Sequence, residues 1–234
     1  MVQKEVSLQE VRQKLARLED SILFSLIGRS EFKTNRLMYV PGGVEVPGFD
    51  GSFFDYLLLG SEKLQASAGR YLDKTEHPFS EGLPTSLAHR KIDPCPLPEG
   101  LNVNRNREIK TIYLSEIPSF CEEGDDNQYG AAALWDIRCL QDLSRRIHFG
   151  MFVAESKYQQ DSQGYAELVK DKDVKGIVDK LRNIQVEEQV LSRLKEKGKR
   201  YGFNPDLVNS FYKDKVIPMT IDVEVEYLFK RAKS

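Results

Sequence analysis

Two cations, Arg146 and Lys157, lie eleven residues apart within an otherwise helical pattern. On an α-helix this spacing is about three turns, so both side chains project from the same face. Gly150, Val153 and Ala154 lie between them on that face. These residues are small or apolar, whereas a solvated face would carry acidic partners, so they predict free space beside the helix. The pattern therefore indicates a cavity with a positive group at each end, which suits an anion.

A second helical segment, predicted at 173–200, carries a polar pair on its apolar face. Asn183 and Glu187 are four residues apart and share the side of Val190 and Leu194. The pair is therefore predicted to point toward the protein interior.

The last helical segment shows the same anomaly. Thr220 and Glu224 are four residues apart and share their side with apolar residues, whereas Asp222 and Glu226 project from the opposite side. Glu224 is therefore predicted to be buried, and Asp222 and Glu226 to be solvated.

Near the N-terminus an apolar stripe includes a further cation. Arg12 projects within the stripe, and Glu19 follows about two turns later. A buried charge costs roughly several kcal/mol unless it is paired or binds a ligand. The stripe consists of Leu8, Val11, Leu15, Leu18, Ile22 and Leu26.

Two explanations fit this set of inward-facing groups. A single pair is most simply a buried salt bridge, and the whole set could form a structural network. Three cations, Arg12, Arg146 and Lys157, nevertheless face only two carboxylates, one amide and one hydroxyl. An excess of positive charge favours a ligand with two carboxylates or phosphates. The core of a helical bundle is a common place for such a site.

Three long strings carry a family resemblance: Asp136 to Lys157, Val216 to Leu228, and Leu8 to Arg12 continued by Glu19 to Phe24. In this order, and nearly from end to end, the chain resembles the all-helical (AroQ-type) chorismate mutases of fungi and plants. The resemblance implies the Claisen rearrangement of chorismate to prephenate in phenylalanine and tyrosine biosynthesis. A pericyclic reaction of this kind needs no nucleophile, metal or cofactor.

The resemblance also implies the roles of the catalytic residues. Arg12 and Arg146 would hold the two carboxylates of chorismate and keep its enolpyruvyl arm folded over the ring. Lys157 and Glu224 would hydrogen-bond the ether oxygen, on which negative charge develops. Glu224 can donate only when protonated, so its burial must raise its pKa.

The remaining matched positions would bind substrate without taking part in bond breaking. Asn183 and Glu187 would hold the ring hydroxyl, and Thr220 would support the site by hydrogen bonding. Glu19 would pair with one of the site arginines when the site is empty.

The regulatory positions depart from the family pattern. Regulated members bind aromatic amino acids at a dimer interface with two adjacent arginines, and with a Gly-Ser motif followed by a threonine. The matching stretches here read Gly69-Arg70 and Gly130-Ala131-Ala132-Ala133-Leu134, so one arginine, the serine and the threonine are missing. Arg70 and Gly130 are therefore candidate remnants of a regulatory site, and weak or no control by tryptophan or tyrosine is expected. A homodimer is still expected.

Composition limits the other classes of function. A net charge of -2 gives no basic footprint for nucleic acid or a membrane surface. The start of the chain lacks the apolar core of a signal peptide, and no stretch is apolar enough to span a membrane, so a cytoplasmic protein is expected, or a secreted one if a leader has been removed. The three cysteines and three histidines lack metal-ligand spacing, and His148 is expected to pack or make a structural hydrogen bond.

The predicted fold is an all-α, single-domain bundle of long helices over residues 1–234, with the active site in the core of each subunit. No segment shows the alternation of a strand. Asp50 is the predicted cap of the second helix, and the proline-rich stretch 82–106, which includes Pro94, is the longest irregular segment. The predicted helices cover residues 5–29, 51–72, 106–120, 130–159, 163–170, 173–200 and 204–231.

Three alternatives remain open on the sequence. A secreted chorismate mutase would act on a host's chorismate pool. A non-catalytic helical protein that binds a dicarboxylate would share the anion site without needing a protonated carboxyl beside Lys157. A purely structural helical dimer would use the same groups as salt bridges and bind no ligand.

Overall fold

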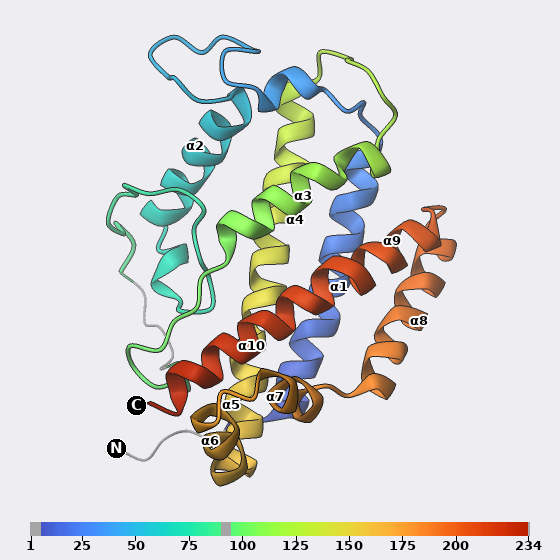
Figure 1. The fold of residues 1–234 in the computed structure, drawn as a ribbon. Coiled ribbons are helices and arrows are strands. Elements are labelled where there is room, and N and C mark those ends of the chain that lie inside the picture. The colour runs from blue at the N-terminus through green and yellow to red at the C-terminus, as the bar shows by residue number, and fades with distance from the viewer. Residues whose placement is uncertain (1–5, 90–94, 234) are drawn as a thin grey trace. The chain divides into compact units, whose positions relative to one another are not determined.

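The structure is a computed structural model that describes residues 6–89 and 95–233. All regular elements in these ranges are helical (Figure 1), so the all-α prediction is confirmed. Three features of the sequence analysis lie outside the described residues: the predicted start of the first helix at residue 5, the opening residues 1–5 that lack the apolar core of a signal peptide, and Pro94. The α-helices are α1 (Leu8–Ser30), α2 (Phe53–Ser67), α3 (Asn106–Phe120), α4 (Tyr129–His148), α5 (Gly150–Gln160), α6 (Ser162–Lys170), α7 (Val174–Leu181), α8 (Ile184–Arg200), α9 (Pro205–Phe211) and α10 (Ile217–Arg231).

The described chain forms two compact units, and neither is a continuous stretch of sequence. The first unit contains residues 6–20, 95–105 and 145–233, and the second contains 21–89 and 106–144. Both units draw on chain from each side of the proline-rich stretch 82–106. The chain passes from the second unit to the first and back within that stretch, because residues 95–105 belong to the first unit and the described residues on either side belong to the second. The assignment of residues 1–234 to one domain stays a prediction. None of the helices in the described ranges combines the length and apolar content needed to cross a bilayer.

The second unit contains a buried ion pair between α1 and α4. Arg29 Nε donates to Asp136 Oδ1 over 2.9 Å, and both side chains are almost fully buried. The hydroxyls of Tyr39 and Tyr113 also donate to Asp136, and the Arg29 guanidinium donates to the carbonyl of Thr34. Because every partner is hydrogen-bonded, this buried charge pair is tolerated and joins the end of α1 to the middle of α3 and α4.

The first unit positions the candidate site by two sets of contacts. Ion pairs join α1 to α8, because Glu19 accepts from Arg193 over 2.8 Å and Asp20 pairs with Lys197. A buried carboxylate joins α5 to α10, because Glu155 accepts from the Tyr227 hydroxyl over 2.6 Å. Figure 1 shows α5 and α10 crossing in close contact.

Four of the predicted helices are interrupted. The segment predicted at 130–159 divides into α4 and α5 at Phe149, whose backbone stays in the right-handed helical region, so the two helices keep nearly one direction. The segment predicted at 173–200 divides into α7 and α8, because Arg182 is extended and Asn183 is the N-cap of α8. The segment predicted at 51–72 ends as α2 at Ser67, and a separate 3₁₀ helix, Arg70–Leu72, follows.

The final predicted helix, 204–231, divides for a physical reason. A π-helical segment, Tyr212–Val216, separates α9 from α10, and the Ile217 amide bonds to the Tyr212 carbonyl. Pro218 follows in the first turn of α10, where its missing N–H costs least. The wider π turn ends the preceding hydrogen-bond ladder just before this residue.

The predicted cap of the second helix was wrong by two residues. Ser52, rather than Asp50, caps α2, because its hydroxyl oxygen accepts from the Asp55 amide over 3.1 Å.

Candidate active site

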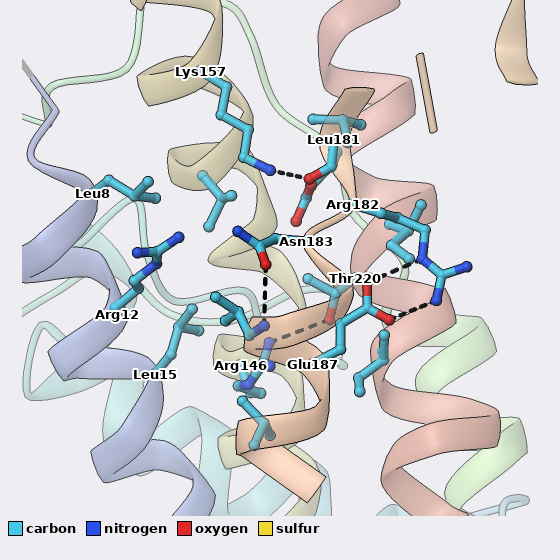
Figure 2. Close-up of a pocket in the computed structure, with 16 residues that line it drawn as sticks. Leu8, Arg12, Leu15, Arg146, Lys157, Leu181, Arg182, Asn183, Glu187 and Thr220 are labelled. Atoms are coloured by element: carbon cyan, nitrogen blue, oxygen red, sulfur yellow. Dashed lines mark hydrogen bonds and ion pairs between the residues drawn. The ribbon is translucent and has the colours of Figure 1, made fainter. Parts of the chain in front are cut away.

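A cavity in the first unit brings together all the predicted catalytic and substrate-binding residues (Figure 2). Side chains from α1, α4, α5, α7, α8 and α10 and from the link between α7 and α8 form its wall. The apolar lining is contributed by Leu8, Leu15, Val153, Leu181, Val186, Val190, Ile217 and Ile221. The polar lining is contributed by Arg12, Arg146, Lys157, Arg182, Asn183, Glu187, Thr220 and Glu224.

Arg146 lies at the end of α4 and is 6% exposed. Its Nη1 donates to Thr220 Oγ1 over 3.3 Å, and the Thr220 hydroxyl donates in turn to the Val216 carbonyl over 2.7 Å. The Nε of Arg146 has no hydrogen-bond partner among the described residues. A buried guanidinium with unused donors is suited to binding an anion.

Lys157 is half-buried on α5, at the other end of the cavity. Its ammonium group donates to the carbonyl of Leu181, the last residue of α7 (Figure 2). Burial lowers the pKa of Lys157, while the nearby Glu224 opposes that shift and Arg12 adds to it. An ammonium group has three donors, so two remain for a ligand.

Glu224 is buried on α10, as the sequence predicts, while Asp222 is exposed. Removal from water raises the pKa of Glu224 to about 7, because desolvation outweighs the opposing effects of Lys157 and Arg146. The charge of Glu187 raises this pKa further. At pH values below about 7 the carboxyl therefore carries a proton and can act as a hydrogen-bond donor.

Gly150 does not provide space in the cavity, although the sequence suggested it. A methyl group at this position would lie 2.9 Å from the Thr220 carbonyl oxygen and 3.1 Å from Glu224 Cγ. The glycine instead lets α5 approach the backbone of α10 where two polar site residues project. Of the three small residues predicted to line the space, only Val153 does so, and Ala154 is fully buried.

The expectation of burial fails for three of the polar residues. Arg12 and Asn183 are exposed, and the side chain of Glu187 is 19% exposed. They lie where the cavity meets solvent. Asn183 also differs in its local structure, because it precedes α8 and its side chain accepts from the Val186 amide over 3.1 Å. Glu187 is held by Arg182, a residue that the helical pattern of the sequence does not single out.

Comparison with known proteins agrees with this geometry. The family described as Chorismate mutase type II matches residues 129–225. The chorismate mutase of Emericella nidulans is 41% identical over 254 aligned residues, which cover 98% of this chain and 94% of the relative. This chain belongs to the chorismate mutase family.

Solved structures of other chorismate mutases share the fold. The crystal structure of a chorismate mutase from Candida albicans, in complex with L-Trp, has a TM-score of 0.93 at 38% identity, covering 97% of this chain and 92% of that chain. The crystal structure of AtCM1 with tyrosine bound in its allosteric site has a TM-score of 0.85 at 35% identity, covering 99% of this chain and 98% of that chain. The resemblance seen in the sequence is therefore confirmed, and this protein is a chorismate mutase.

The two candidate regulatory residues of this chorismate mutase lie in the second unit. Arg70 is in the short 3₁₀ helix and donates to Glu76 over 2.9 Å, and to the side-chain oxygens of Gln65 and Gln141. Gly130 is in the first turn of α4, and an added methyl group there would meet no atom within 4 Å. The guanidinium of Arg70 is thus already bonded to three side chains.

Glu19 pairs with an arginine, but the arginine is not one that lines the cavity. Its partner is Arg193 on α8, at 2.8 Å, and the Glu19 side chain is 1% exposed. The pair holds the middle of α1 beside α8. Arg12 and Glu187, which project from these two helices, are thereby placed on the same cavity.

His148 Nε2 accepts from the Arg105 amide over 2.9 Å, which is the structural role expected for it. Cys95, Cys121 and Cys139 are free thiols, and residues 6–89 and 95–233 contain no group of His, Cys, Asp and Glu that could hold a metal ion.

We predict that Gly150→Ala destabilises the enzyme by about 1–3 kcal/mol and lowers kcat, because the methyl group pushes α10 and its two site residues away from α5. Urea unfolding and steady-state kinetics measure both effects. Gly60→Ala is the matched control, because a methyl group on α2 meets nothing within 4 Å and should leave kcat unchanged. Normal stability and kcat in Gly150→Ala would show that the close approach is not needed.

Proposed function

We propose that chorismate binds in this cavity and that Arg12 and Arg146 hold its two carboxylates. Among the described residues, four cations and two carboxyl groups line the cavity. The cations are Arg12, Arg146, Lys157 and Arg182. Of the two carboxyl groups, Glu224 is buried, whereas Glu187 is only partly buried. With Glu224 protonated, the described lining has a net charge of +3. This positive charge attracts a dianion. A bound dianion also neutralises cations that are partly removed from water in the empty cavity. Holding both carboxylates also restrains the flexible enolpyruvyl arm in its reactive conformation.

The observation that carries the mechanism is the burial of the Glu224 carboxyl, which raises its pKa to about 7 although the charge of Lys157 opposes the rise. As the C–O bond of the ether breaks, electron density moves onto the ether oxygen, while the new C–C bond forms at the other end of the arm. Lys157 and Glu224 donate hydrogen bonds to that oxygen and stabilise its developing charge. Each preorganised donor of this kind contributes about 3–4 kcal/mol to the transition state.

The other lining residues orient the ring. Glu187 accepts a hydrogen bond from the ring hydroxyl, and the amide of Asn183 lies beside it at the start of α8. Thr220 supports Arg146 through the bond from Nη1. These contacts are present before and after bond breaking, so they contribute to substrate binding more than to kcat.

We propose that the enzyme serves phenylalanine and tyrosine synthesis in the cytoplasm as a homodimer. Large apolar side chains on the second unit support the dimer, since Leu64 of α2 is 75% exposed and Leu134 of α4 is 65% exposed. Cell fractionation separates this role from that of an exported enzyme acting on a host's chorismate pool.

We predict that Arg146→Ala and Lys157→Ala each lower kcat/KM by at least about 100-fold. Both variants should fold. Loss of either cation raises the pKa of Glu224 further, so the buried carboxyl stays neutral and leaves no unpaired negative charge in the interior. The assay follows loss of chorismate and formation of prephenate, and circular dichroism checks folding. Lys195→Ala is the control, because its exposed pair with Asp206 lies outside the cavity. An unfolded Arg146→Ala variant with normal specific activity in its folded fraction would favour a structural role.

We predict that kcat/KM falls as pH rises through about 7, because Glu224 then loses the proton that it donates. The negative charge of bound substrate disfavours ionisation of Glu224 and raises its pKa further. The fall in kcat should therefore come at a higher pH than the fall in kcat/KM. Glu224→Gln supplies an amide donor at every pH, and it should keep measurable activity and lose most of the alkaline decline. Glu224→Ala should be slow throughout. A Gln variant as slow as the Ala variant, or one with the parent's pH profile, would contradict the assignment.

We propose that aromatic amino acids control this enzyme weakly. Gly69, Ala131 and Leu134 replace polar groups that regulated relatives use, and a methyl or isobutyl group cannot bond the charged ends of an amino acid. Tryptophan and tyrosine should change the rate at subsaturating chorismate by less than about twofold, whereas typical allosteric coupling is about 5- to 150-fold. Larger activation or inhibition would show that Arg70 and its neighbours form an effector site.

A further inference from the structure

Arg182 and Glu187 form a two-pronged ion pair at the edge of the substrate cavity. Nε of Arg182 donates to Oε1 of Glu187 over 3.0 Å, and Nη2 donates to Oε2 over 2.6 Å (Figure 2). Both side chains line the cavity, and both also line a second groove on the other side of the pair. The pair is thus a wall between the cavity and the protein surface.

The backbone on each side of Arg182 is fixed. Its amide bonds to the Val178 carbonyl at the end of α7, and the next residue, Asn183, caps α8. The carbonyl of Leu181 accepts from Lys157. The guanidinium therefore extends from a link that is held at three consecutive residues, and it reaches Glu187 in the first turn of α8.

This ion pair contributes little to the stability of the fold. The side chain of Arg182 is 41% exposed and that of Glu187 is 19% exposed. Solvent screens pairs of this kind, so removing one partner changes the unfolding free energy only slightly. What the pair does provide is geometry, because a guanidinium bound through two parallel bonds fixes the plane of a carboxylate.

The paired carboxylate can still bind substrate. A carboxylate has about four acceptor sites, and the two bonds from Arg182 use two of them. The remaining sites of Glu187 can accept a hydrogen bond from a hydroxyl group in the cavity. In the absence of Arg182, Glu187 would sample other rotamers, and binding would have to restrict them.

We propose that Arg182 is a positioning residue that orients Glu187 toward the ring hydroxyl of chorismate, and so sets the preference of the enzyme for a hydroxylated ring. This inference rests on the proposed role of Glu187. Arg182 acts through the carboxylate and does not itself touch the reacting atoms.

The test compares Arg182→Lys and Arg182→Gln with the parent enzyme. Lysine keeps the positive charge but cannot make the two parallel bonds, so both variants should raise KM for chorismate by roughly threefold to tenfold. The contact is made equally in ground and transition states, so kcat should change by less than about twofold. Lys195→Gln, which removes a charge from α8 outside the cavity, should leave both constants unchanged. Thermal unfolding of all three variants should match the parent.

Two further measurements separate orientation from general charge. A chorismate analogue without the ring hydroxyl should react with equal kcat/KM in the parent and in both Arg182 variants. In the background of Glu187→Gln, replacing Arg182 should add little, because the two residues act through one contact.

The outcomes are distinguishable. A normal KM in Arg182→Lys, with a raised KM in Arg182→Gln, would assign the effect to charge alone and overturn the inference. A lower KM in either variant would show that Arg182 competes with substrate for Glu187, and would also overturn it. If the parent converts chorismate and the analogue equally well, the proposed role of Glu187 fails and the inference falls with it.

Discussion

The burial of one carboxyl group between two cations is the constraint on which the site depends. Glu224 is 6% exposed, and desolvation outweighs the attraction of Lys157 and Arg146, so its neutral form persists to about pH 7. A fully ionised Glu224 would pair with those cations and cancel the charge that the substrate needs. The contact between α5 and α10 at Gly150 maintains this burial, because it leaves no room for water beside Glu224 Cγ.

The remaining charges follow from that arrangement. Since Glu224 does not neutralise the cations, Arg146 retains a buried Nε without a partner among the described residues, and Lys157 turns to a backbone carbonyl. Glu187 is compensated separately by Arg182 at the solvent side of the cavity. Arg146 thus lies in the interior of the cavity, whereas the exposed Arg12 and the paired Glu187 lie where the cavity meets solvent. This arrangement fits the proposal that Arg12 and Arg146 hold the two carboxylates of the substrate and that Glu187 holds its hydroxyl.

Helical periodicity predicted the parts of the site that lie on uninterrupted helices. Thr220 and Glu224 lie inside α10, so the four-residue spacing placed both on the buried face. Phe149 interrupts the predicted helix without changing its direction, so Arg146 and Lys157 still line one cavity. Asn183 lines the cavity as the N-cap of α8, and no pattern in the sequence indicates the extended residue before it.

The residues that the sequence missed depend on tertiary geometry. On a continuous helix Arg182 and Glu187 would project about 140° apart, so no periodic pattern could pair them. The extended backbone between α7 and α8 brings them together. The partner of Glu19 could not be chosen from the sequence either, because Arg193 is distant along the chain and meets it only through the packing of α1 and α8. The exposure of Arg12 depends likewise on where the cavity opens.

The most direct test of this account is the protonation state of Glu224 in the free enzyme. Infrared difference spectra between the parent and Glu224→Gln, recorded as a function of pH, isolate the C=O stretch of this one protonated carboxyl. The account predicts that the band persists through mildly acidic pH and disappears around pH 7, where the raised pKa of Glu224 lies. A band that is lost near the ordinary glutamate value of about 4.3 would show that Glu224 is ionised at neutral pH and cannot donate to the ether oxygen.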